Sequence, residues 1–155
     1  MGFFFGRIPS LEYETRLLMR ITLESDYALR ILTAMAGYLG ITDAKKIAED
    51  TSVTPRFALK ILHKLVQGDI VQSYKGVNGG YTLKISPDKI TLKSVIELID
   101  GPICITRCID GECSLNSDKT ACTYHHIFDT ISLDLARKLD GITISDVINK
   151  TYTLK

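Results

Sequence analysis

The chain has 155 residues, 45% of them hydrophobic, and a formal net charge of +1, which suits one domain with a core of its own. No apolar run approaches the ~18 residues that a membrane-spanning helix needs, so we expect no membrane span. No Ser-His-Asp, HExxH or phosphate-loop pattern is present, so we predict that the protein is not an enzyme.

The near-neutral net charge conceals a local asymmetry. Residues 54–89 carry six Lys or Arg against two Asp, which gives this segment +4 and the remainder of the chain −3. A basic segment in an otherwise neutral protein indicates a polyanion as partner.

The first residues carry little structural signal. The apolar start is too short for a signal-peptide core, and Glu12 and Glu14 follow soon after it. Met19 reads as a second start, so we interpret residues 1–18 as an N-terminal extension or a start-site artefact. Without a secretion signal, we expect a cytoplasmic protein.

Two helices are expected next. Thr22 is the predicted N-cap of a helix to Leu39, with Gly40 as its stop, because apolar side chains recur there every four residues. A short helix over residues 44–51 follows, capped by Thr42 or Asp43.

A third helix is predicted from Pro55 to Gln67, with Thr54 as N-cap and Gly68 as stop. Two helices joined by a short turn, the second with a basic outer face, form the helix-turn-helix pattern of DNA-binding proteins. The alternative is a basic face that is only solvated. The apolar face comprises Phe57, Ala58, Ile61, Leu62, Leu65 and Val66, and the opposite face comprises Arg56, Lys60, His63, Lys64 and Gln67.

A β-hairpin is predicted directly after this helix, with strands over residues 70–74 and 81–85. Asn78-Gly79 can take the positive backbone angles of a hairpin turn, and Lys75 is placed to reach phosphates or a minor groove. The alternatives are a plain tight turn and a solvated charge. The expected fold is therefore mainly α with a small β-hairpin wing, a winged helix-turn-helix over residues 19–100.

The C-terminal part is predicted to be helical. Thr91 caps an expected helix over residues 92–99, and a short helix is expected over residues 145–150. Between them, a long helix over residues 124–139 has more apolar surface than a lone helix can cover, so it must pack on the domain or on a partner copy. Residues 124–155 thus comprise this long helix and the short C-terminal helix, and the apolar stripe of the long helix consists of Ile127, Ile131, Leu135 and Leu139.

All four cysteines lie between residues 104 and 122, and two histidines follow at 125 and 126. Thiolates and an imidazole on a turn-rich loop suit zinc or an iron–sulfur cluster. No Cys-x-x-Cys pair of the usual closed zinc site occurs. The looser spacing from Cys108 to His125 favours a larger inorganic core, and zinc and a disulfide remain as alternatives. We expect residues 101–123 to form this cluster-binding loop.

The order of these motifs resembles the Rrf2 family of bacterial regulators. The resemblance rests on Asp26-Tyr-Ala, the helix-turn-helix, the Gly76-Val-Asn-Gly-Gly-Tyr81 wing and the loop ending in Cys122-Thr-Tyr-His125. It implies a homodimeric repressor that binds a double-stranded operator, with no small-molecule substrate. The long helix over residues 124–139 would pair the two subunits, through the dimerisation stripe Ile127, Ile131, Leu135 and Leu139. It also implies an iron–sulfur cluster, with 2Fe–2S favoured over 4Fe–4S, as in IscR-like and NsrR-like members.

The resemblance implies four cluster ligands, Cys108, Cys113, Cys122 and His125. The longer spacing before Cys122 and the additional Cys104 depart from the family pattern, and Cys104 is an alternative ligand. In some members the fourth ligand comes from the N-terminal part of the partner subunit, which makes Glu24 or Asp26 further alternatives.

The function implied is a regulator whose DNA binding responds to iron–sulfur status, oxidants or nitric oxide. The alternative is a cluster-free regulator of CymR type, controlled by thiol oxidation or a partner enzyme. Leu59 stands where IscR-like members often place a base-reading glutamate. The predicted DNA contacts are Thr54, Arg56, Phe57, Lys60, Lys64, Lys75, Asn78 and Gly79.

Overall fold

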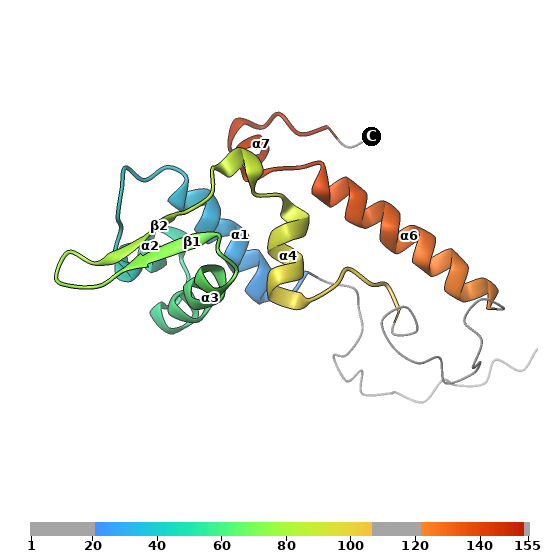
Figure 1. Cartoon of the computed structure of the whole chain (residues 1–155), viewed down its shortest axis with the longest axis horizontal. Coiled ribbons are helices and arrows are strands. Elements are labelled where there is room, and N and C mark those ends of the chain that lie inside the picture. The colour runs from blue at the N-terminus through green and yellow to red at the C-terminus, as the bar shows by residue number, and fades with distance from the viewer. Residues whose placement is uncertain (1–20, 107–121, 154–155) are drawn as a thin grey trace, which may run out of the picture.

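The computed structural model describes residues 21–106 and 122–153 (Figure 1). It is mainly helical with one two-stranded antiparallel sheet, as expected from the sequence. The elements are α1 (Leu23–Met35), α2 (Ala44–Thr51), α3 (Pro55–Gln67), β1 (Val71–Tyr74), β2 (Gly80–Leu83), the 3-10 turn η1 (Pro87–Lys89), α4 (Leu92–Asp100), α6 (Thr123–Asp140) and α7 (Ile144–Asn149).

Helix starts follow the local capping signals. The side chains of Thr22, Asp43 and Thr91 accept hydrogen bonds from backbone N–H groups in the first turns of α1, α2 and α4, which confirms these caps. Thr54 occupies the N-cap position of α3 but makes no side-chain capping bond.

The predicted end of the first helix was wrong, because α1 stops at Met35 and not at Leu39. Gly37 weakens the helix, and the Tyr38 hydroxyl donates to Asp50 Oδ2 of α2 at 2.7 Å. The chain therefore turns toward α2, and Leu39 is left fully exposed.

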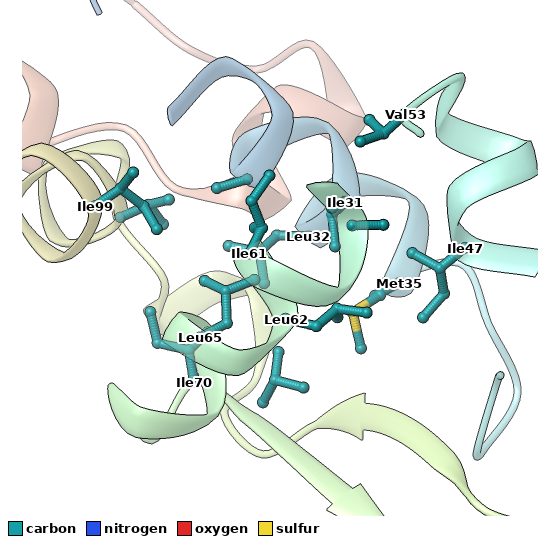
Figure 2. Packing of buried hydrophobic residues seen from close by; sticks show 14 of the residues in the cluster. Ile31, Leu32, Met35, Ile47, Val53, Ile61, Leu62, Leu65, Ile70 and Ile99 are labelled. Carbon is teal, nitrogen blue, oxygen red and sulfur yellow. The ribbon is translucent and has the colours of Figure 1, made fainter. Parts of the chain in front are cut away.

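The core lies between α1 and α3 (Figure 2). Ile31 and Leu32 of α1 and Ile61, Leu62 and Leu65 of α3 are completely buried there. Each such side chain contributes roughly 1.5–3 kcal/mol through loss of contact with water. The core thus fixes the buried side of α3 and leaves the opposite side of that helix in solvent.

The wing is an antiparallel hairpin in which Val71 pairs with Leu83 and Tyr74 with Gly80. Its turn is closed by the Gly79 N–H, which donates to the Gly76 carbonyl oxygen at 3.0 Å. The predicted positive backbone angles at Asn78-Gly79 were wrong, since the positive φ, 108°, lies at Gly76. Gly79 is required for another reason: a Cβ there would lie 2.4 Å from the Tyr74 carbonyl oxygen.

Helix α6 extends away from the winged helix (Figure 1). Its 18 residues span about 27 Å, and Ser132 is its one fully buried residue among those described. Its C-terminal end is fastened to the body, because Leu92 N–H donates to the Ile142 carbonyl and Ile144 N–H donates to the Ile90 carbonyl, both at 2.9 Å.

Helix α7 then packs beside η1 and α1, and Ile144 is completely buried in the core that α1 and α3 form. The C-terminal helix is therefore part of the winged-helix body. Among the described helices, none has the length and apolarity to cross a bilayer.

Candidate functional site

The outer face of α3 is the surface that a helix-turn-helix presents to DNA. Arg56 and His63 are exposed on it, and Leu59, between them, is 48% exposed. Phe57 lies to one side, where its ring meets Tyr27 edge-on with centroids 6.1 Å apart. The predicted contact residues of α3 thus form two sets. Arg56 faces outward, whereas Phe57, Lys60 and Lys64 are turned toward α1.

Lys60 and Lys64 belong to the set turned toward α1. Both are held by one carboxylate, that of Glu24: the Lys60 Nζ donates to Oε2 at 2.9 Å, and the Lys64 Nζ lies 2.8 Å from Oε1. Glu24 is only 17% exposed. Sequence reasoning missed this Glu24 clamp, since Glu24 lies 36 positions before Lys60 and no local pattern links them.

The clamp affects the protonation of Glu24. Partial burial raises its pKa, but hydrogen bonds and charges from Lys64 and Lys60 outweigh burial, so the pKa of Glu24 lies below its ordinary value. The carboxylate stays ionised at neutral pH and forms ion pairs with both lysines.

One other cation of the basic segment and one on α2 are also paired. Lys84 lies 2.7 Å from Asp69, and on α2 Lys46 lies 2.9 Å from Asp50. Within residues 21–106 and 122–153, Arg56 of α3 and Lys75 of the wing are exposed and make no ion pair. These two predicted contacts are therefore available to a polyanion without loss of an internal partner.

A polar junction connects α3 to the segment that leads into the cysteine loop. Asp100, the last residue of α4, accepts hydrogen bonds from the Thr22 backbone N–H at 3.2 Å and from the Ser25 hydroxyl at 2.8 Å. Lys64 Nζ also donates to the carbonyl of Ile99 at 3.3 Å. The start of α1, the end of α4 and the recognition helix thus meet at one point, immediately before residue 101.

Of the predicted cluster ligands, Cys108 and Cys113 lie outside the described residues. Cys122 is the N-cap residue of α6, without a capping hydrogen bond, and His125 lies in the first turn of that helix. Residues three apart on a helix lie on the same side, so these two predicted ligands lie near each other. His125 Nδ1 is buried and has no hydrogen-bond partner in the described part of the chain.

Cys104 lies elsewhere. It lines a hollow of about 270 Å³ between the start of α1, the end of α4 and α6, together with Ile96, Leu135 and Leu139. Next to it, the Ile105 N–H donates to Ser132 Oγ at 3.0 Å. Ser132 follows His125 by seven residues, about 10 Å along the helix. Within the described residues, no three Cys, His, Asp or Glu side chains gather as a metal site would require.

The alternative ligands on α1 are engaged in ion pairs. The Glu24 carboxylate holds Lys60 and Lys64, and Asp26 Oδ2 lies 2.7 Å from Arg30 on the same helix. Either residue would have to exchange a cation for iron in order to serve as a ligand.

The predicted dimerisation stripe on α6 is uncovered in part. Ile127 and Ile131 are 48% and 47% exposed, whereas Leu135 and Leu139 are half-buried in the wall of the hollow. Tyr124 and Leu133 are exposed as well. A single chain therefore leaves the N-terminal part of α6 with apolar side chains in solvent.

The sequence profile of one protein family, Rrf2, described as an iron-dependent transcriptional regulator, matches residues 21–150. The chain belongs to the Rrf2 family. Rrf2 proteins are DNA-binding transcriptional regulators, and this chain is therefore a regulator rather than an enzyme.

Individual Rrf2 relatives agree with this assignment over nearly their whole length. The chain is 27% identical to the transcriptional regulator NsrR of Bacillus subtilis, over 88% of this chain and 96% of that protein. NsrR of Bacillus licheniformis is 26% identical over 84% and 92% of the two chains.

Two solved Rrf2-type structures support the fold. CymR, the global cysteine regulator of B. subtilis, superposes with a TM-score of 0.68 at 25% identity, covering 87% of this chain and 100% of CymR. IscR of T. potens superposes with a TM-score of 0.67 at 20% identity, covering 86% and 88%.

Proposed function

We propose that the protein is a cytoplasmic, homodimeric repressor whose DNA binding is controlled by an iron–sulfur cluster held by Cys108, Cys113, Cys122 and His125. The observation that carries the proposal is the buried Nδ1 of His125, one turn beyond Cys122, which has no hydrogen-bond partner among residues 21–106 and 122–153. A buried polar atom without a partner costs about 1–3 kcal/mol, and a bond to iron would satisfy it.

The helix terminus adds support for Cys122 as a ligand. The first N–H groups of a helix have no intrahelical partner and carry a partial positive charge. Cys122 occupies the N-cap position beside these N–H groups, and thiolates are the form in which cysteines bind iron. Cys104 lines the hollow with Leu135 and Leu139, and its neighbour Ile105 is hydrogen-bonded to Ser132, about 10 Å along α6 from His125, which supports a ligand set without Cys104.

Cluster binding would alter DNA binding through contacts within the chain itself. Cys108 and Cys113 of the loop, Cys122 and His125 would hold the cluster, so that the loop and the first turn of α6 would be cross-linked when it is bound. At its other end the loop begins at the polar junction, where Asp100 holds α1 and Lys64 holds the last turn of α4. A change of loop conformation therefore acts on both the dimer helix and the recognition helix. A coupling of ~1–3 kcal/mol would change operator affinity by roughly 5–150-fold.

The DNA surface we propose is the outer face of α3 and the wing. Arg56, near the start of α3, is placed for base edges or phosphate, and Lys75 for the minor groove or its flanking phosphates. Lys60 and Lys64 would contact phosphates only by leaving Glu24. Thr54, Phe57, Asn78 and Gly79 complete the proposed surface, and domain bounds of 19–100, 101–123 and 124–155 remain part of the proposal.

Dimerisation is proposed through α6. Ile127 and Ile131 are about half exposed on the part of α6 that projects from the body, and a second copy would cover them. The two winged helices would then face DNA half-sites about one helical turn apart.

A second candidate is a cluster-free regulator of CymR type, in which Cys104 or Cys122 senses oxidants. The structure of CymR favours it, since CymR superposes as well as IscR does and at higher identity.

Anaerobic purification separates the two candidates. We expect visible absorbance, with iron and sulfide in stoichiometric amounts, that is lost in Cys122→Ala and altered in His125→Ala. His126→Ala is the matched control, because His126 lies next to His125 but is exposed. A colourless wild-type protein, or full cluster content in Cys122→Ala, would contradict the proposed cluster and favour thiol-based control. Equal effects of Cys104→Ala and His125→Ala would contradict the ligand set.

A further inference from the structure

The outer face of α3 carries one side chain that neither the core nor the ion pairs account for. Leu59 is 48% exposed and does not belong to the core cluster. We propose that Leu59 determines operator specificity by contacting the 5-methyl group of a thymine in the major groove. The proposal rests on DNA binding, which the family establishes, and not on the iron–sulfur cluster.

Helix geometry places Leu59 where bases are read. At 3.6 residues per turn, Leu59 lies one turn after Arg56 and one turn before His63, on the exposed side of α3 where it borders the buried face, about 100° around the helix from the fully buried Ala58 and about 60° from the fully buried Leu62. It also lies in the N-terminal half of the recognition helix, whose side chains contact base edges.

The two lysines leave this position clear. Lys60 follows Leu59 by one residue and so points about 100° around the helix from it. Its Nζ is drawn to Glu24 at the α1 flank, and Lys64 is held at the same carboxylate. The surface around Leu59 is therefore not shielded by these long cationic side chains.

The exposed Phe57, two residues earlier on α3, has structural contacts of its own. The Phe57 ring packs edge-on against Tyr27, and Lys60 Nζ lies 5.9 Å above it. No comparable ring or charge contact involves Leu59 in the described part of the chain. An isolated exposed leucine is common on protein surfaces, so its place on the recognition helix, not its exposure alone, carries the inference.

The chemistry of the bases selects thymine. In the major groove, thymine alone presents an apolar group, the C5-methyl, whereas cytosine presents an N4 amino donor on the same side. Leucine has no hydrogen-bonding group, so it would leave a buried cytosine amino group without a partner. A thymine methyl against Leu59 removes two apolar surfaces from water and leaves no polar atom unpaired.

The test begins by selecting the preferred sequence of the full-length wild-type protein from random duplexes. Each thymine in that sequence is then replaced singly by deoxyuridine, which removes only the methyl group. We expect one position in each half-site where deoxyuridine weakens binding about four-fold, corresponding to ~0.8 kcal/mol for one buried methyl. At that position 5-methylcytosine should bind better than cytosine.

Variants then assign the effect to Leu59. Leu59→Ala should bind the thymine and uracil duplexes equally, because the partner of the methyl group is gone. Val77→Ala is the matched control, since Val77 is a fully exposed apolar residue at the wing tip, and it should keep the four-fold difference.

Three outcomes would overturn the proposal: no enriched sequence, no position sensitive to deoxyuridine, or unchanged sensitivity in Leu59→Ala. Should Leu59→Ala fail to fold, Leu59→Ser takes its place. The test then compares the deoxyuridine sensitivity of the wild type with that of Leu59→Ser. A colourless protein would contradict the iron–sulfur proposal while leaving this one standing, so the two failures are distinguishable.

Discussion

The Glu24 clamp predicts that a single neutral substitution strengthens DNA binding. In Glu24→Gln the carboxylate that holds Lys60 and Lys64 loses its charge, and both ammonium groups become available to phosphates. We expect tighter binding to operator and scrambled duplexes alike, because phosphate contacts carry no sequence information.

The magnitude follows from the number of lysines released. Each new phosphate contact adds about 0.9 to the slope of log affinity against log salt, so two lysines add up to about 1.8 per subunit. When the salt concentration rises from about 50 to about 200 mM, each added phosphate contact lowers the DNA affinity by a further factor of roughly 3.5. The free energy of unfolding should fall by about 1 kcal/mol, since the lysines are partly exposed and screened by solvent.

The assay is a DNA titration at three salt concentrations, with Asp26→Asn as the matched control. Asp26 lies two residues later on α1, pairs with Arg30, and gives the same change in net charge without touching α3. Equal salt slopes for the two variants would refute the reasoning and show that the lysines act only in folding. The stability difference has a defined pH window: because the pKa of Glu24 is lowered, the clamp stabilises the protein above pH 4.5 and is lost as pH falls through that lowered pKa.

Three further measurements test other parts of the molecule. Ile131→Glu should yield a monomer or an aggregate by light scattering, because a dimer would bury its charge, while a stable dimer would exclude α6 as the interface. Lys75→Ala should weaken binding and flatten the salt slope by about 0.9 per subunit, and an unchanged slope would place the wing away from DNA. Tyr38 donates to Asp50, and burial together with this bond raises the pKa of Tyr38 to about 12, so one of the seven tyrosines should titrate late by ultraviolet absorbance. Tyr38→Phe should remove that late step; if it persists, the assignment is wrong.

Local signals in the sequence predicted much of the fold. Asp43 and Pro55 set the starts of α2 and α3, and the bounds expected for both helices agree with the structure. These signals act within one helical turn, so they can be recognised without knowing what the helix packs against. The end of α1 depends instead on a bond from Tyr38 to another helix, and the sequence prediction missed it.

In the candidate site, too, local features were predicted from the sequence and long-range contacts were not. The basic face of α3 was visible from periodicity, but its electrostatics were not, because Glu24 reaches Lys60 across 36 positions and Asp100 reaches Thr22 across 78. In the wing, the turn itself was predicted but the residue with the positive φ was not. The Asn78-Gly79 pair suggested a positive φ, yet the glycine with that angle is Gly76. Gly79 is needed because a side chain there would collide with the Tyr74 carbonyl oxygen. A dipeptide preference thus indicated a turn without indicating which residue bends.

The burial of Ile144 has a consequence for how the protein is made. The side chain from α7 completes a core otherwise built by residues 28–99, and the backbone pairing of Ile144 with Ile90 joins them. A ribosome delivers residues in order at roughly 5–20 per second, and domains fold as units during synthesis. The winged helix cannot complete its core until residue 144 has been made. A truncated product that ends before residue 144 would carry the recognition helix on a core that lacks Ile144, and a nascent chain would complete its DNA-binding shape only after α7 has been made.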